Sequence, residues 1–318
     1  MEIVPINGPE DLRETTRGSD VEIVQLKPGK LHGSITHVDI GNLTMSAGRF
    51  SSDTRMKGLL HREKVVLATL LDSAGRVTHW WREVRPGDVG VHPAGADIDA
   101  IHCGGASYLV VSIALREFLS MLAGEDRLAD PAFWNTKGVH QIDSRVGNDM
   151  LRQLRAILSD VERKTTAPSA QASDLLKCSI IEAFVSSVMH SQPSDGGRSQ
   201  YTGARLVSEV EDYVDAAGER PVHISELCRA MRVSRRSLHR SFAETLGIGP
   251  VAYLRRRRLS TIRSVLKRSD PAAISIPDIA FDYGFPEPGR FCAFYRSHFG
   301  ESPSETLHSR PAGIHKKR

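Results

Sequence analysis

The sequence has few cysteines and no long apolar run. Its 318 residues include only 4 cysteines, which are isolated from one another: Cys103, Cys178, Cys228 and Cys292. Isolated cysteines exclude a disulfide framework and fit a reducing compartment. No stretch approaches the ~20 apolar residues of a membrane span. Because Met1–Pro5 also lacks the basic and apolar regions of a signal peptide, we expect a cytoplasmic protein without membrane contact.

The sequence also lacks the usual signatures of catalysis and of cofactor binding. It contains neither a glycine-rich phosphate loop nor a nucleophile elbow. The histidines His61, His79, His92 and His102 stand singly, which is more typical of structural or exposed residues than of metal ligands. We therefore predict that the protein is not an enzyme and binds neither a metal nor a cofactor.

What is present is a strongly basic C-terminal third. Residues 221–318 contain 18 Lys and Arg against 8 Asp and Glu, a net charge of +10. Because the whole chain carries only +4, residues 1–220 carry −6. A basic module joined to an acidic one is typical of a nucleic-acid-binding domain.

The basic third contains one pattern twice, at Ile224–Phe242 and Asp278–Gly300. Each copy reads as a short helix, a turn and a longer basic helix, the form of a DNA-binding helix-turn-helix. Leu227 recurs as Ile279 after 52 residues, whereas Leu238 recurs as Phe291 after 53, so the second turn has one extra residue. The repeat indicates a duplicated unit and two neighbouring contacts with double-stranded DNA.

Residues 203–308 resemble the AraC/XylS-type transcription regulators. The most specific match comprises Ile279-Ala280, Gly284-Phe285, Phe291, Tyr295-Arg296, Phe299-Gly300 and Ser302-Pro303. The resemblance implies an all-α tandem helix-turn-helix domain. It also implies a regulator that often activates transcription through RNA polymerase and often carries a cupin-like sensing domain.

The first copy has more side chains suited to reading bases. Leu238, Phe242 and Leu246 form an apolar stripe, so the residues between them should face DNA. By resemblance, Arg236, His239 and Arg240 occupy base-contacting positions. We predict that Ser225 and Ser234 cap the two helices of this copy, and that the DNA contacts of the whole domain are Arg235, Arg236, Ser237, His239, Arg240, Glu287, Arg290 and Arg296.

The second copy departs from the family at Pro288, Gly289 and Ala293, none of which can donate a side-chain hydrogen bond to a base. We therefore expect this copy, whose recognition helix starts near Glu287, mainly to hold the DNA backbone. Between the copies, Pro250–Leu266 predicts a rigid joining helix. The run Arg255–Arg258 wraps around that helix, so only some of its arginines can face DNA while others pair with carboxylates or remain solvated.

The first 115 residues predict short strands, and residues 116–192 predict helices. Apolar segments that alternate with turn signals favour a sandwich or barrel: Val21–Leu26, Ile35–Ile40, Leu43–Ala47, Val65–Leu71, Thr78–Trp81, Val89–Val91 and Tyr108–Ile113. Together with Arg85–Gly95, which resembles a cupin-type turn, they predict a cupin-like β-barrel with packed helices in an α+β protein. Ile98 replaces the usual downstream metal-ligand His, which argues against the rival interpretation of a metal-dependent cupin enzyme fused to a DNA-binding module.

The candidate effector-binding residues are Arg49, Arg55, Trp80 and Trp81. Adjacent residues of a strand point to opposite faces, so one tryptophan should face a small-molecule effector. Each tryptophan could instead fill the core, and each arginine could form a surface salt bridge. If the barrel is purely structural, the protein is a regulator controlled by its abundance or by a partner.

We expect four segments: a sensing and dimerisation domain at 1–192, a linker at 193–201, the tandem helix-turn-helix at 202–310 and a basic tail at 311–318. The linker assignment rests on its Ser and Gly content. Amphipathic stripes in Met150–Arg163 and Leu175–Val188 should pack on the barrel, and surplus apolar surface on the second favours a homodimer.

Overall fold

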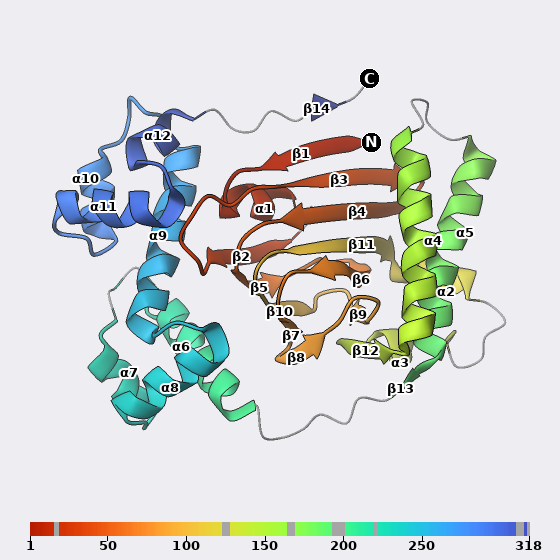
Figure 1. Cartoon of the computed structure of the whole chain (residues 1–318), viewed down its shortest axis with the longest axis horizontal. Coiled ribbons are helices and arrows are strands. Elements are labelled where there is room, and N and C mark those ends of the chain that lie inside the picture. The colour runs from red at the N-terminus through yellow and green to blue at the C-terminus, as the bar shows by residue number, and fades with distance from the viewer. Residues whose placement is uncertain are drawn as a thin grey trace.

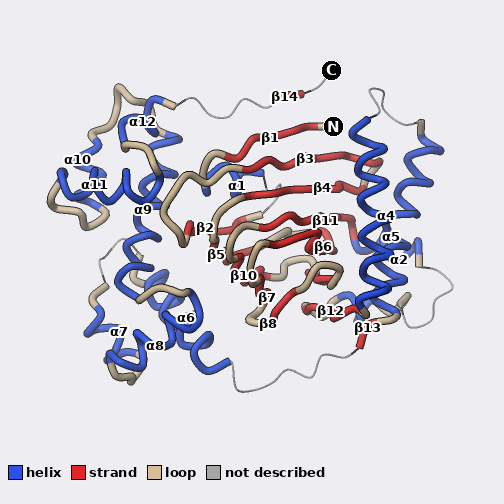
Figure 2. The backbone as a smooth tube through the Cα atoms, in the orientation of Figure 1, coloured by secondary structure: helices blue, strands red, loops and turns tan. Residues whose placement is uncertain are grey.

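The computed structural model describes residues 1–15, 19–122, 128–163, 169–192, 201–218, 220, 222–309 and 315–316. Strands occupy the middle of the molecule, with α4 (Ser144–Arg163) and α5 (Ala170–Met189) on one side and a helical module on the other (Figures 1 and 2). Within the described residues, no helix has both the length and the apolar character required to cross a membrane.

The strands form two sheets. The larger has nine strands in the order β13-β12-β9-β6-β11-β4-β3-β1-β14. Their bounds are β1 Glu2–Ile6, β3 Gly33–Ile40, β4 Leu43–Phe50, β6 Lys64–Ser73, β9 Val89–His92, β11 Ala106–Ala114, β12 Gly138–Ile142, β13 Ser191–Gln192 and β14 His315–Lys316.

The smaller sheet has five strands in the order β2-β5-β10-β7-β8. Their bounds are β2 Asp20–Gln25, β5 Thr54–Leu59, β7 Val77–His79, β8 Arg82–Val84 and β10 Asp97–His102. All pairs in both sheets are antiparallel, so alternate residues of a strand face opposite layers.

This alternation places a separate core on each side of the large sheet. Along β11, Leu109, Val111 and Ile113 face the helices, and Tyr108 faces the small sheet. The helix-side core joins the sheet to α2 (Leu115–Met121), α3 (Pro131–Trp134), α4 and α5, with Trp134 fully buried. Helix α1 (Pro9–Thr15) lies between β1 and β2 in the sequence.

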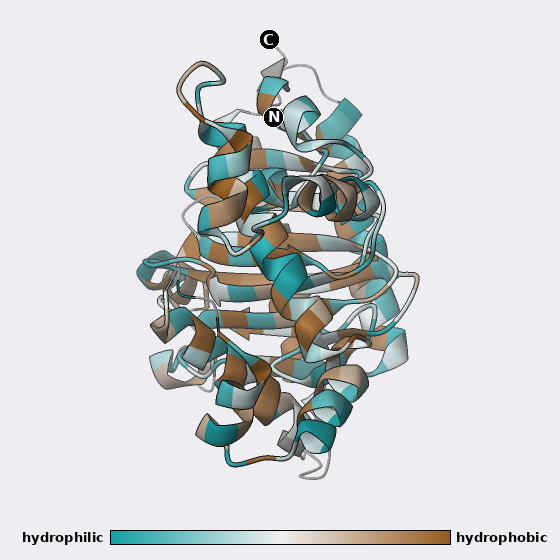
Figure 3. Ribbon diagram, turned by 90° about the vertical axis from the view of Figure 1, so that its left-hand side faces the viewer, coloured by the Kyte–Doolittle hydropathy of each residue, from teal (hydrophilic) through white to brown (hydrophobic). Residues whose placement is uncertain are grey.

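The helical module has two subdomains joined by α9 (Pro250–Arg268). The first contains α6 (Tyr201–Ala216), α7 (Ile224–Ala230) and α8 (Arg235–Leu246). The second contains α10 (Ile276–Asp282), α11 (Pro288–Phe299) and α12 (Pro303–His308). Hydrophobic and hydrophilic residues alternate along these helices, as expected for amphipathic helices packed on a core (Figure 3).

The module docks on the outer face of the small sheet. Val24 of β2, Leu26 directly after it and Ile101 of β10 share one core with Val207 of α6 and Tyr253 of α9. The second subdomain has its own core around Phe291 and Tyr295.

Buried arginines reinforce the docking. Arg55 of β5 lies 2.7 Å from Asp99 and 2.8 Å from Glu211 of α6. Arg263 of α9 lies 2.9 Å from Glu10 of α1, and both side chains are 2% exposed. Burial alone lowers the pKa of Arg55, but Glu211 and Asp99 raise it above its ordinary value. The two parts of the chain are therefore joined by apolar contacts and by paired charges.

The predicted α+β class and the order of the two parts are confirmed. Six of the seven predicted strand segments are strands apart from their exact ends, whereas Thr78–Trp81 is a strand only at Thr78 and His79. The strands form two sheets rather than one closed barrel. The predicted linker, apart from its last residue, lies outside the described residues. The domain boundaries therefore remain predictions. Two residues of the predicted basic tail, 315–316, form β14 beside β1.

The expected placement of Trp80 and Trp81 on a strand is wrong. They form the two-residue turn between β7 and β8, with His79 paired to Arg82, and both have positive φ values, 46° and 66°. A two-residue hairpin favours positive φ at both positions because it matches the twist of the strands. The two indoles still point to opposite sides. Trp80 packs with the core between the two sheets (the inter-sheet core), and Trp81 packs with the core between the small sheet and the helical module (the docking core).

We predict that Leu154→Ala lowers the free energy of unfolding by about 2–5 kcal/mol, because Leu154 of α4 is fully buried in the helix-side core. Ser159→Ala on α4 is the matched control, since Ser159 is exposed on the same helix, and should change the free energy of unfolding by about 0.5 kcal/mol or less. Urea unfolding measures both, and equal losses would contradict the observed packing.

Candidate DNA-binding interface

The two helix-turn-helix copies share the same local geometry. In the first, Arg232 takes a left-handed conformation with φ of 53° and the Val233 amide donates to the Cys228 carbonyl. In the second, Gly284 has φ of 77° and the Phe285 amide donates to the Ala280 carbonyl. The extra residue predicted for the second turn lies between Phe285 and the N-cap Glu287, since Val233 in the first copy is followed directly by the N-cap Ser234.

Capping residues fix where the recognition helices begin. The Ser234 hydroxyl accepts a hydrogen bond from the Ser237 amide and caps α8, as predicted. The predicted Ser225 cap is wrong, because α7 begins at Ile224 and its N-cap is His223, two residues before Ser225. The second recognition helix, α11, has Glu287 at its N-cap and Pro288 at its first position.

The first recognition helix presents basic side chains on its exposed face. Leu238, Phe242 and Leu246 are buried as predicted. Arg235, Arg236, His239 and Arg240 are exposed, and Ser237 is half-buried beside Ser234. Among the described residues, none forms an ion pair with these arginines. Their guanidinium groups are therefore available to a partner.

The second recognition helix presents fewer donors. Phe291, Tyr295 and Phe299 are buried, and Glu287, Arg290 and Arg296 are exposed. Arg290 lies 3.1 Å from Glu287 in a pair within the helix. The exposed Pro288, Gly289 and Ala293 have no polar side-chain atom.

The arginine run of α9 turns mostly inward. The Arg257 guanidinium lies 2.7 Å from Glu22 of β2 and also pairs with Asp215. Arg256 donates to the Leu26 carbonyl, and the guanidinium of Arg255 lies 4.3 Å from the ring of Phe294. The sequence predicted that some of these arginines pair with carboxylates, and this is confirmed for Arg257.

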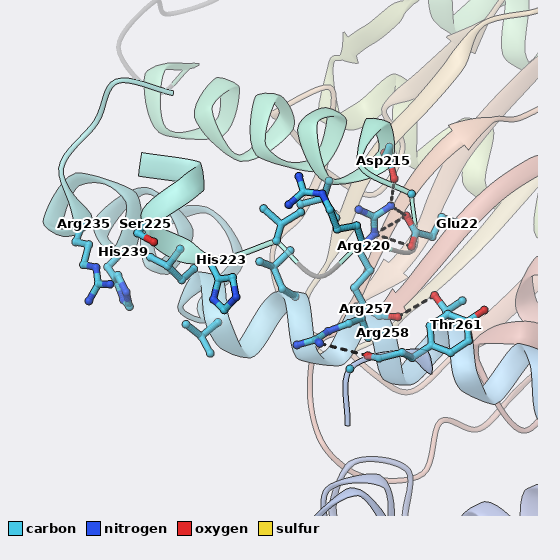
Figure 4. A pocket seen from close by; sticks show the side chains of 18 residues that line it. Glu22, Asp215, Arg220, His223, Ser225, Arg235, His239, Arg257, Arg258 and Thr261 are labelled. Atoms are coloured by element: carbon cyan, nitrogen blue, oxygen red, sulfur yellow. Dashed lines mark hydrogen bonds and ion pairs between the residues drawn. The ribbon is translucent and has the colours of Figure 1, made fainter. Parts of the chain in front are cut away.

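A groove of about 870 Å³ lies between the two copies. Its walls include Arg235 and His239 of α8 and Arg258 of α9 (Figure 4). Tyr283 of the second turn also lines it. At another part of the wall, Arg257 lies against Glu22 and Asp215. The groove connects the exposed start of the first recognition helix with the second copy.

The four candidate effector residues do not form one site, although Arg55 and Trp81 are in contact. Arg49 is exposed on β4 of the large sheet, whereas Arg55 is buried in the small sheet by Asp99 and Glu211. Trp80 lies on the inter-sheet side, with its ring centroid 4.6 Å from that of His92. Trp81 lies on the docking side, with the Arg55 guanidinium 4.8 Å from its ring.

The sequence did not show that three histidines meet between the sheets. The ring centroid of His79 lies 5.9 Å from that of His92 and 5.7 Å from that of His102. Both ring nitrogens of His92 are buried without a hydrogen-bond partner among the described residues. No group of residues suited to a metal ion occurs in the described ranges. The pairing of β7 with β10 brings His79 and His102 together, and the packing of the two sheets adds His92 from β9.

Comparison with known proteins identifies the C-terminal region. Residues 227–309 match the family model described as "Helix-turn-helix domain". The chain is 37% identical over 106 residues to the probable thc operon regulatory protein of Rhodococcus erythropolis, covering 33% of this chain and 32% of that protein. It is 28% identical over 194 residues to XylDLEGF operon transcriptional activator 3 of Pseudomonas putida, covering 58% and 56%.

Residues 227–309 form an AraC-type helix-turn-helix domain. The relatives are named as regulators or activators of transcription, and the chain spans between about a third and three fifths of the length of the two described here. Among solved structures, the AraC-like transcriptional activator CuxR is 14% identical, with a TM-score of 0.42 over 81% of this chain and 94% of that one.

We predict that stability falls as the pH is lowered from about 6.5 towards 4. Burial lowers the pKa of His102 from 6.5 to about 3, so the unfolded chain binds a proton in this range and the folded chain does not. Above pH 6.5 His102 is neutral in both the folded and the unfolded state, so it does not make the stability depend on pH. Unfolding free energies measured across this range should fall less steeply in His102→Gln than in the natural protein, and equal slopes would contradict the assignment.

Proposed function

We propose that this protein is a sequence-specific, non-enzymatic transcription regulator that acts in the cytoplasm and responds to a small molecule. One observation carries the proposal: a tandem AraC-type domain presents exposed basic side chains from the start of its first recognition helix. The names of the relatives favour activation, which requires contact with RNA polymerase.

The geometry suits two neighbouring contacts on one face of DNA. Recognition helices enter successive major-groove segments about one helical turn apart, and a single helix, α9, joins the two copies here. The groove between the copies then faces the intervening DNA backbone. Arg235 and Arg258 in its walls supply positive charge for phosphates.

The two copies have different roles in this proposal. Arg236, His239 and Arg240 read base edges, because side chains near the start of a recognition helix reach them. Arg235 and Ser237 contact the backbone. In the second copy, Arg290 and Arg296 hold phosphates, and Glu287 is its other polar contact.

The effector site lies between the sheets, on the Trp80 side of the turn. His92 offers one hydrogen-bond donor and one acceptor that lack partners among the described residues, beside an aromatic ring. A planar small molecule that both accepts and donates hydrogen bonds fits this chemistry. Arg49 and Arg55 are excluded from this proposed site by their placement.

The outer face of α5 supports a homodimer. Leu175 is 66% exposed and Met189 is 49% exposed; their separation is close to four helical turns, so both lie near one face. Leu175→Glu should lower the molar mass measured by light scattering from that of a dimer to that of a monomer. A wild-type monomer at working concentration would contradict this part of the proposal.

DNA recognition is tested by selecting binding sites from randomised duplexes with the full chain. Failure to enrich any sequence would contradict the proposed function. Thermal-shift screening of small metabolites then tests the effector; a protein that no metabolite stabilises would favour control by abundance or by a partner.

We predict that Arg240→Ala and Arg290→Ala weaken DNA binding in different ways. Loss of a base-reading arginine should cost about 1–3 kcal/mol on the preferred site and relax the sequence preference. Loss of a phosphate contact should weaken binding to all sequences similarly and reduce the salt dependence by about one charge. Affinities for selected and scrambled duplexes at several salt concentrations distinguish the two, and equal losses of specificity would contradict the asymmetry.

A further inference from the structure

The turn between β7 and β8 combines two bulky residues with an unusual backbone. Trp80 and Trp81 both have positive φ, a conformation that Asn and Gly adopt far more readily than aromatic residues. The flanking pair His79 and Arg82 is held in register within the small sheet. Such backbone strain persists where surrounding contacts fix it, and it often marks a functional segment.

Trp80 extends this turn into the space between the sheets. Its indole N–H donates to the Asp97 carbonyl at 3.1 Å, and its ring lies against His92. His92 is 1% exposed, and neither of its ring nitrogens has a partner among the described residues. Trp80 is thus in contact with the residue that is best placed to hydrogen-bond a ligand.

Trp81 extends the same turn toward the helical module. It packs with the docking core and lies beneath the guanidinium of Arg55, 4.8 Å from the ring. Arg55 donates two hydrogen bonds to Glu211 of α6, at 2.8 and 3.1 Å, and two to Asp99, at 2.7 and 3.2 Å.

Glu211 connects Arg55 to two helices of the module, α6 and α9. It lies on α6 and also accepts a hydrogen bond from the Tyr253 hydroxyl of α9. Arg55 and Glu211 are both almost completely buried. A buried Arg and Glu cannot separate without leaving uncompensated charge, so a shift of Arg55 is transmitted to α6 and α9.

We propose that the Trp80–Trp81 turn couples the interior of the sandwich to the orientation of the DNA-binding domain, through Arg55 and Glu211. Adjacent residues in a turn pinned at both ends cannot be reoriented independently. A ligand that binds His92 and displaces Trp80 therefore moves Trp81 away from Arg55. The inference rests on the proposed function, because it assigns the route by which the effector site regulates DNA binding.

Coupling is tested by a double-mutant cycle in the full chain, with the Kd for a selected duplex as the readout. Trp80→Phe alters the packing between the two sheets, and Glu211→Gln weakens the contact of Glu211 with Arg55. We expect Trp80→Phe to change the Kd at least about fivefold, and to change it less than about twofold in the Glu211→Gln background. Equal effects in both backgrounds, or no effect in either, overturn the proposal.

The matched control is Glu10→Gln. Glu10 also forms a buried cross-domain pair, with Arg263 at 2.9 Å, but it has no contact with the turn among the described residues. Trp80→Phe should keep its full effect in the Glu10→Gln background. Loss of the effect there as well would show that general undocking, rather than this route, is responsible, and would overturn the proposal.

A second measurement needs neither DNA nor a ligand. Trp80→Phe should speed hydrogen exchange of the α6 amides at least about fivefold, while exchange in α10 stays unchanged. Unchanged exchange in α6 overturns the coupling even if no duplex is ever selected, an outcome that contradicts only the proposed function. If circular dichroism shows that Trp80→Phe is unfolded, Trp80→Tyr takes its place in both experiments.

Discussion

Buried arginines that cross from one half of the chain to the other constrain the whole molecule. A guanidinium stays charged at any physiological pH, so burying one is costly unless carboxylates meet it with good geometry. Arg55 meets Asp99 and Glu211, and Arg263 meets Glu10. Each pair fixes a point on the small sheet or α1 relative to the helical module. The docking is therefore defined by specific partners rather than by apolar contact alone.

Because of this constraint, some basic residues of the C-terminal third pair with acidic residues of the N-terminal half, and others remain exposed. Arg257 and Arg263 on α9 neutralise acidic groups of the N-terminal half, which carries the opposite net charge. Arg236 and Arg240 on α8 remain exposed. Charge complementarity between the halves thus orients the module and leaves its basic recognition face toward solvent.

Local sequence patterns predicted much of the fold because their causes are local. Alternating apolar residues indicated the strands, and the stripe of Leu238, Phe242 and Leu246 indicated α8 with its exposed face. Ser234 was identified as a cap because a capping hydroxyl needs only an amide three residues away. The prediction of Ser225 as a cap was wrong because the N-cap lies two residues earlier, at His223, and local sequence alone defines helix ends poorly.

The sequence by itself determined that this chain carries two unequal helix-turn-helix copies. The periodicity and spacing of the two copies can be seen in the sequence, as can the absence of side-chain hydrogen-bond donors at Pro288, Gly289 and Ala293. Tertiary structure alone decided the surroundings of Arg55, the turn at Trp80 and Trp81, and the meeting of His79, His92 and His102. Their partners lie on strands and helices distant in sequence. Which of them meet depends on strand register and domain docking, and those are set by the sum of all contacts rather than by any local pattern.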